Sequence, residues 1–154
     1  MFKFKLQPVL RYREWIEEEK LAVFAAKQRI FENEKAKARA IREMQQQYRL
    51  AHREEALKED VSVTMLSFFQ DYIFLLEGRK ARQDELVELA RQALAEAQAE
   101  LIEAKKQKEI MEKVKERAAK IFMDEEMRVE QLALDDFSTI KHVRTQRGLN
   151  HFAN

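Results

Sequence analysis

The sequence predicts an all-α fold: a long two-helix antiparallel coiled-coil hairpin with a C-terminal helical overhang. Only two glycines and one proline occur in 154 residues, and a chain with so few turn-forming residues changes direction rarely. Charged residues make up 37% of the chain and are nearly balanced in sign, a composition typical of coiled coils and long helices. Apolar residues also recur with a seven-residue period along most of the chain.

The first predicted helix runs from about residue 8 to about residue 59 and is about 75 Å long. Pro8 lies in its first turn, where proline is tolerated because the missing N–H would have no partner in the helix. The predicted seam is the line of side chains that packs against the other helix. On this helix it contains Val9, Ile16, Val23 and Ile30 at one heptad position, Tyr12, Ala26 and Ala40 at the second, and then Ile41, Met44, Tyr48 and Ala51.

The turn of the hairpin is predicted at about residues 60–64. Its two valines and one threonine have stiff side chains and modest helix propensity. Ser62 can cap the next helix, and Val61 and Leu66 have the spacing of a hydrophobic staple around that cap.

The second predicted helix runs from about residue 65 to about residue 147, so that residues 1–154 form one hairpin. Its predicted seam contains Leu66, Ile73, Val87, Leu94 and Leu101, with Phe69, Leu76, Ala90, Ala97 and Ala104 at the second heptad position. Lys80 and Gln83 interrupt this seam, and its phase then slips by about one residue, to Val114, Ala118 and Ile121. Gly78 indicates a kink or a close contact. The helix is expected to end with Lys141, His142, Arg144 and Arg147 in its last turn and Gly148 as a left-handed cap.

The two predicted helices differ in length. Folding at the turn pairs Tyr48 with Leu76, Ile30 with Leu94, and Val9 with Val114. Beyond Lys115 the second helix has no partner, and we call this part the overhang. It still carries apolar residues: Ala118, Ile121, Phe122, Val129, Leu132, Phe137 and Ile140. Such a stripe predicts contact with another molecule, and self-association of two overhangs into a dimer is the alternative.

Composition excludes several classes of function. A net charge of +1 lacks the basic excess of nucleic-acid binders. The chain has no cysteine and no glycine-rich phosphate loop, and no run of apolar residues is long enough to span a membrane. Its carboxylates have no predicted pocket, and His52, His142 and His151 are far apart along the chain. We therefore expect no catalytic residue, no cofactor, no metal site and a cytoplasmic location.

Residues 2–20, FKFKLQPVLRYREWIEEEK, resemble the N-terminus of the FliJ family of the flagellar type III export apparatus. In that family an aromatic–basic start leads into the pattern Leu-x-x-Val-Leu-x-x-Arg-x-x-x-Glu. Gln47-Tyr48-Arg49 and residues 69–77, FQDYIFLLE, are also similar to the family. The resemblance covers nearly the whole chain, except for the tail from Thr145 to Asn154.

The resemblance implies a non-catalytic stalk that resembles the two long helices of the rotary ATPase γ subunit. Its partners would be the export ATPase hexamer, the cytoplasmic domain of the large export-gate membrane protein, and export chaperones, which it helps to recycle. The stalk would be a monomer when isolated. It would associate with the inner face of the cell membrane only through these partners, at the base of the flagellum, and would serve flagellum biogenesis, motility and chemotaxis.

Two surfaces follow from this resemblance. A turn-proximal patch would bind the export gate and contains Ile41, Met44, Tyr48, Tyr72 and Leu76. The other surface would bind the ATPase ring and contains Phe2, Phe4, Leu6, Ile121, Phe122, Val129 and Leu132, with the N-terminal arm, residues 2–6, alongside the overhang. The alternative for the turn-proximal patch is a wide hydrophobic core near the turn.

Three other functions stay open from the sequence. One is a chaperone hairpin whose apolar tip, with Phe68, Tyr72 and Phe74, holds unfolded or exported client proteins. Another is a structural coiled coil that dimerises through its overhang. The third is a stalk of another type III system or another rotary ATPase, because shape alone does not separate these stalks.

Overall fold

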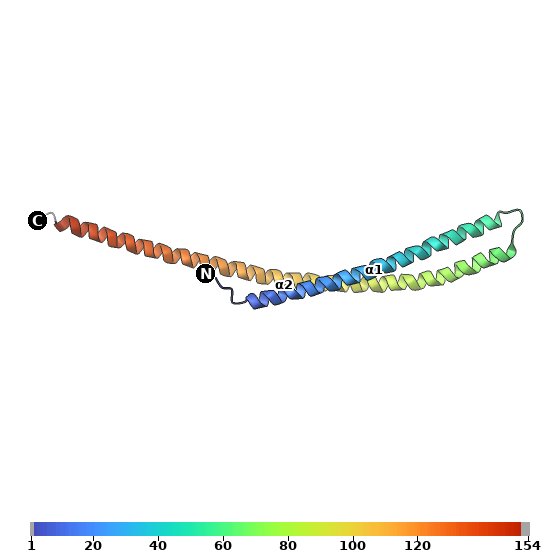
Figure 1. Cartoon of the computed structure of the whole chain (residues 1–154), viewed down its shortest axis with the longest axis horizontal. Helices are drawn as coiled ribbons and strands as arrows, with labels where there is room; N and C mark the ends of the chain where they lie inside the picture. Colours follow the sequence, from blue (N-terminus) through green and yellow to red (C-terminus); the bar gives the residue numbers. More distant parts are fainter. Residues whose placement is uncertain (1, 152–154) are drawn as a thin grey trace. The chain divides into compact units, whose positions relative to one another are not determined.

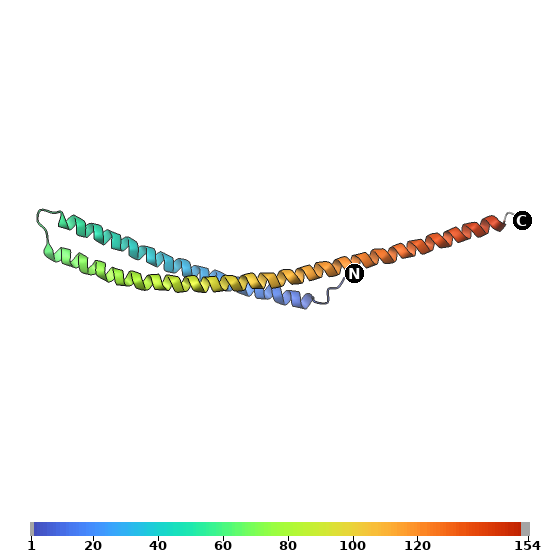
Figure 2. The ribbon, with the colours of Figure 1, turned by 180° about the vertical axis from the view of Figure 1, so that it is seen from behind.

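In the computed structural model of the chain, α1 (Gln7–Ala56) and α2 (Val63–His151) run in opposite directions from one short turn (Figures 1 and 2). The structure describes the backbone of residues 2–151 and the side chains of residues 2–140, and this part of the chain contains no strand. The predicted all-α hairpin with a helical overhang is confirmed. Contacts divide the chain into a turn unit, residues 15–106, and a terminal unit, which joins residues up to 14 with residues from 107 onward.

The first helix ends at Ala56, three residues before the predicted end at 59. The amide N–H groups of Leu57 and Lys58 donate to carbonyl oxygens three residues earlier, at 3.2 and 3.3 Å. Such i→i−3 bonds tighten and close the last turn of a helix. The turn therefore occupies residues 57–62 instead of 60–64.

Ser62 starts the second helix, as its sequence context predicts. Its Oγ accepts a hydrogen bond from the Met65 N–H at 3.3 Å, and its carbonyl oxygen accepts one from the Leu66 N–H at 3.0 Å. The Glu55 carboxylate reaches across the turn and accepts a hydrogen bond from the Ser62 N–H at 3.2 Å and another from the Lys58 ammonium. One side chain thus ties the end of α1 to the cap of α2.

The seam of α2 in the turn unit is the predicted one. All of its predicted members are buried or half-buried: Leu66, Phe69, Ile73, Leu76, Val87, Ala90, Leu94, Ala97, Leu101 and Ala104. Leu76 is the most enclosed of them, with 1% of its surface exposed. The seam is therefore narrow and rich in alanine along its second half.

Between Val23 and Ala40 the predicted seam of α1 is wrong by one residue, whereas Ile16 and Ala51, on either side of this stretch, are half-buried as predicted. Val23 and Ile30 are 40% and 49% exposed, so the predicted pairing of Ile30 with Leu94 is not part of the packing. The helix instead turns Phe24, Phe31, Ala38 and Gln45 inward, and these are buried or half-buried. Ile41 and Tyr48 are half-buried as predicted. Burying two phenylalanine rings removes more apolar surface from water than burying a valine and an isoleucine. Small alanines on the facing helix leave room for these rings.

Three ion pairs join the two helices at the surface of the turn unit. They are Lys20–Glu100 at 2.7 Å, Arg42–Asp84 at 3.1 Å and Arg49–Glu77 at 3.2 Å. The four side chains of the last two pairs are 40–61% exposed, and exposed pairs contribute little to stability. The register of the hairpin therefore depends mainly on the packing of the seam.

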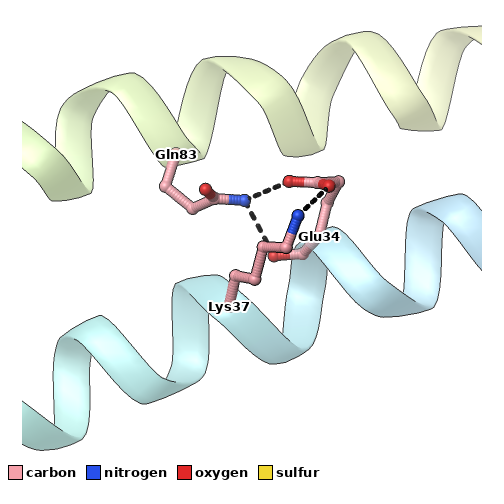
Figure 3. A network of polar contacts seen from close by, with 3 residues as sticks. All are labelled: Glu34, Lys37 and Gln83. Atoms are coloured by element: carbon pink, nitrogen blue, oxygen red, sulfur yellow. Dashed lines mark hydrogen bonds and ion pairs between the residues drawn. The ribbon is translucent and has the colours of Figure 1, made fainter.

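A polar layer interrupts the seam at Gln83 (Figure 3). The Gln83 Nε2 donates to the Glu34 carbonyl oxygen at 3.1 Å and to the Glu34 carboxylate at 2.5 Å, while the Lys37 ammonium donates to the same carboxylate at 2.7 Å. The hydrogen bond from Lys37, followed by that from Gln83, holds the pKa of Glu34 below its usual value. Polar residues inside a coiled-coil seam favour one register over others because other registers leave them unpaired.

In the terminal unit the N-terminal arm lies on α2. The Phe2 ring contacts the Phe122 ring with centroids 5.7 Å apart, and the Phe4 ring stacks on Phe2 at 6.5 Å. Leu10 of α1 is 3% exposed. The arm therefore covers α2 as far as Phe122, beyond the predicted limit at Lys115.

The predicted slip of the α2 seam does not occur. Val114 and Ile121 are 37% and 68% exposed. The heptads of the turn unit instead continue without a break through half-buried residues, namely Lys108, Met111, Lys115, Ala118 and Phe122. Lysine stems can line a seam because their methylene groups pack while the ammonium reaches water.

Every residue from 123 to 140 is exposed, and we call this part of the overhang the exposed segment. The helix continues to His151, past Gly148, so the cap predicted at Gly148 does not end it. The side chains of Lys141, His142, Arg144 and Arg147, predicted for its last turn, lie outside the described residues.

The contacts of Glu55 predict a loss of stability in acid. The hydrogen bonds from Lys58 and then from the Ser62 N–H lower the pKa of Glu55 from its ordinary 4.5. A carboxylate with a lowered folded pKa stabilises the fold above its unfolded pKa, and this contribution is lost as pH falls through the folded pKa. Glu55→Gln should therefore lower the melting temperature at pH 7, and the difference from the wild type should be smaller at pH 3. Thermal unfolding followed by circular dichroism at both pH values measures this, and an equal difference at both would contradict it.

Gly78 lies in the interior of α2, where the fold of the chain does not require a glycine. It has no positive φ, and a Cβ built on it would meet nothing within 4 Å, so neither strain nor an internal close contact explains it. Gly78→Ala should therefore raise the free energy of unfolding by about 1 kcal/mol, the usual gain in helix propensity. Urea unfolding measures the change, and an unchanged or lower stability would show that the glycine is needed by the fold.

Candidate interaction surfaces

The exposed segment is apolar on several sides. At 3.6 residues per turn, its large apolar residues, together with Ile121 and Phe122 just before it, fall on three lines along the helix. The first line contains Met123, Met127, Leu134 and Phe137, the second Phe122, Val129 and Ile140, and the third Ile121 and Leu132. All of them except Phe122 are more than half exposed. A helix that is apolar all round is normally buried on all sides, and nothing in the described chain covers this one.

Carboxylates lie between these apolar lines. Residues 123–140 contain six acidic side chains and one basic one, Arg128, which gives a formal charge of −5. Arg128 pairs with Glu125 at 3.1 Å. The segment therefore combines an apolar surface with a strong negative charge, although the whole chain is close to neutral.

An open groove begins where the arm ends. It is lined by Phe122, Glu125, Glu126, Val129 and Glu130, and thus has an apolar floor and an acidic rim. Since Phe122 and Val129 are one heptad apart, the floor is the continuation of the seam that the rest of the chain fills. The N-terminal arm occupies the start of this line and leaves the rest open.

The structure brings together only part of the residues predicted to bind the ATPase ring. Phe2 and Phe122 are in contact and half-buried, and Phe4 lies against Phe2. Leu6 is 44% exposed. The remaining three residues, Ile121, Val129 and Leu132, lie on two different sides of the open helix.

The turn-proximal patch is an aromatic cluster between the two helices. The Tyr48 ring lies 4.3 Å from the Tyr72 ring and 6.1 Å from the Phe69 ring, and the Tyr72 hydroxyl donates to Met44 Sδ at 3.4 Å. Leu76 is almost fully buried in the seam. Met44, Tyr48 and Tyr72 therefore gather in one place, whereas Ile41 is half-buried and Leu76 offers no surface to a partner.

Phe68 extends this patch toward solvent. Its ring stacks on that of Tyr72 with centroids 6.2 Å apart, and it is 53% exposed. Sequence reasoning places it at the edge of the seam, because successive helical residues point about 100° apart. Leu57 and Val63, beside the turn, are 80% and 77% exposed, and sequence reasoning did not select them.

The described residues offer no arrangement suited to metal binding. No group of three His, Asp or Glu side chains among them is placed to hold a metal ion. No helix in this part of the chain is long and apolar enough to cross a membrane. The surfaces are suited to contact with other proteins.

Comparisons with known proteins agree with this architecture. A family model described as flagellar FliJ protein matches residues 2–147. The structure is similar to that of a putative YscO homologue from Chlamydia trachomatis, with a TM-score of 0.65. The two chains share 22% sequence identity, and the likeness covers 96% of this chain and 99% of that one, which shows a common fold. A comparison with curated proteins finds no match.

Proposed function

We propose that this chain, which belongs to the flagellar FliJ family, is a non-catalytic stalk that links the hexameric export ATPase to the cytoplasmic domain of the export-gate membrane protein. The observation that carries the proposal is the exposed segment, a helix with apolar side chains on three lines and no cover from its own chain. In this proposal it enters the central hole of the ATPase ring.

The distribution of apolar residues supports a ring over a single partner helix. A neighbouring helix in a coiled coil covers one stripe about 100° wide or less. It could cover the second and third lines, which are about 80° apart around the helix, but it would leave the first line, on the opposite side, in water. The wall of a hole surrounds the helix and removes apolar surface from water on every side, at roughly 25 cal/mol per Å².

The position of the turn-proximal patch supports a second partner. Met44, Phe68 and Tyr72 lie in the turn unit and the exposed segment lies in the terminal unit, so the two surfaces share no residue. Aromatic residues and methionine are enriched in protein interfaces. We assign this patch to the export gate.

The remaining parts of the proposal rest on the family to which the chain belongs. The chain is a monomer in isolation and reaches the inner face of the membrane at the flagellar base through its partners. Export chaperones, the third class of partner, bind transiently and are recycled.

One observation favours a second candidate function, a chaperone hairpin that holds client proteins. Exposed apolar side chains surround the turn: Leu57, Val63, Met65, Phe68 and Phe74 are 45–80% exposed. A client-binding tip would use these residues and would not need the exposed segment. The two functions therefore respond to mutations in different units.

The first test removes apolar contacts from the exposed segment. Ile121→Asp with Val129→Asp places two carboxylates on different sides of a helix that should be enclosed, so the double variant should lose stimulation of the export ATPase. The hairpin should stay folded because both residues are more than half exposed. ATP turnover by the purified ATPase, titrated with each hairpin, measures the effect.

A matched control is Leu86→Asp with Leu89→Asp in the turn unit, where the two side chains are 44% and 61% exposed. This variant should stimulate the ATPase like the wild type. Equal stimulation by wild type and the Ile121/Val129 variant would remove the exposed segment from the mechanism. Loss of client binding from turn-unit variants alone would favour the chaperone function.

The second test concerns the export gate. Met44→Ala with Tyr72→Ala removes the exposed part of the turn-proximal patch and should weaken binding to the purified cytoplasmic domain of the gate protein, while ATPase stimulation stays intact. Isothermal titration calorimetry measures the binding. Leu76→Ala serves as the stability control, because truncating this buried leucine should cost about 2–5 kcal/mol of stability and remove no exposed contact. Normal gate binding by the folded double variant would show that the patch is wrongly assigned.

A further inference from the structure

We infer that the partner surface around the exposed segment is basic as well as apolar, with Lys or Arg side chains placed opposite the carboxylates that lie between its apolar lines. This inference rests on the proposed function, since it takes the ATPase ring as the partner. It adds the chemistry by which that partner is recognised.

The carboxylates need partners once the helix is enclosed. Residues 123–140 contain six acidic side chains but only one basic side chain, an arginine. Within the described side chains only Glu125 of these six has an ion pair, with Arg128. In water the other five are hydrated, but removing unpaired carboxylates from water is unfavourable unless cations or hydrogen-bond donors replace the water. Enclosure of this helix by a purely apolar wall would therefore be unfavourable.

Like the apolar lines, the carboxylates are distributed over several sides of the helix. Asp124 and Asp135 are eleven residues apart, about three turns, so they lie on one side. Glu125 and Asp136 have the same spacing and lie on a second side. The third pair, Glu126 and Glu130, lies between the first and second apolar lines and forms part of the rim of the groove beside Phe122. Cations are therefore required on several sides, which a ring of subunits can supply and one partner helix cannot.

The same charge argues against a second copy of this chain as the occupant. Pairing two exposed segments would bring together two helices with a formal charge of −5 each. Like charges at close range are unfavourable. A partner of opposite charge covers the same apolar surface and also neutralises the carboxylates.

The test uses the pair at the groove. Three full-length proteins are compared with the wild type for binding to the purified export ATPase at low and high salt: Glu126→Gln with Glu130→Gln, Glu126→Lys with Glu130→Lys, and a control, Glu85→Lys with Glu96→Lys. The control makes the same charge change at exposed carboxylates of the turn unit. Lysine is a good helix former, so circular dichroism should show unchanged helix content in all of them.

Opposite charges on the partner should make wild-type binding weaker at high salt. The glutamine variant should bind about tenfold more weakly at low salt, the lysine variant still more weakly, and both should lose part of the salt dependence. The control should bind like the wild type. Equal binding by the lysine variant, or a wild type indifferent to salt, would overturn the inference.

Failure of this inference is distinguishable from failure of the proposed function. If Ile121→Asp with Val129→Asp abolishes ATPase stimulation while the lysine variant stimulates normally, the stalk function stands and the basic surface is wrong. If wild-type protein neither binds nor stimulates the ATPase, both are wrong. Sedimentation of the wild type at low salt as a dimer that the lysine variant strengthens would identify a second copy as the occupant and would also overturn the inference.

Discussion

Close packing between an alanine-rich face of α2 and aromatic rings of α1 is the interaction on which the hairpin depends. Ala90 and Ala97 are buried, whereas Phe24 and Phe31 are half-buried on the other helix. Small residues on one helix allow large ones on the other to fill the space between the axes without cavities. Because the surface ion pairs are exposed, they add little to this packing. The polar layer of Glu34 and Gln83 adds specificity, since a shift in register would separate Gln83 from Glu34 and leave the Gln83 amide without this partner.

Because α2 is longer than α1, part of α2 is left without a packing partner in the chain and forms the exposed segment. The seven-residue repeat of α2 continues past the part of α2 that packs against the N-terminal end of α1. The N-terminal arm then covers α2 only as far as Phe122. Val129 and Leu132, which follow Phe122, lie at further positions of the same repeat and are exposed. The chain thus fills the seam of α2 itself as far as Phe122 and leaves these apolar positions open. The turn-proximal patch differs, because its rings already pack on one another and present only their outer edges.

The features that could be predicted from the sequence were those with one strong signal. The seam of α2 follows because its leucines and alanines have no competing stripe, and the cap at Ser62 follows from local chemistry. On α1 two neighbouring stripes compete, and the choice between Ile30 and Phe31 depends on the side chains that face them across the hairpin. The predicted slip of the α2 seam was wrong for a related reason. The side-chain stems of Lys108 and Lys115 occupy seam positions, but a pattern of apolar residues alone assigns lysines to the surface. Leu76 was predicted both to pack in the seam and to contact a partner. Its burial in the structure, which the sequence does not give, places it in the seam.

The exposed segment must also hold its helix without help from tertiary packing. Starting a helix is costly, whereas adding a residue to an existing one fixes few dihedrals and gains one hydrogen bond. α2 is already formed and anchored by the seam before residue 123, so the exposed segment extends a helix and does not start one. Its residues are mainly good helix formers, with Met, Glu, Gln, Leu and Ala prominent and no glycine or proline from 123 to 140. A partner therefore meets a helix that is largely preformed, and little of the binding free energy is spent on ordering it. Anchoring one end of a long helix in a hairpin thus presents an uncovered apolar and acidic surface, and such a surface suits the enclosing partner that we propose.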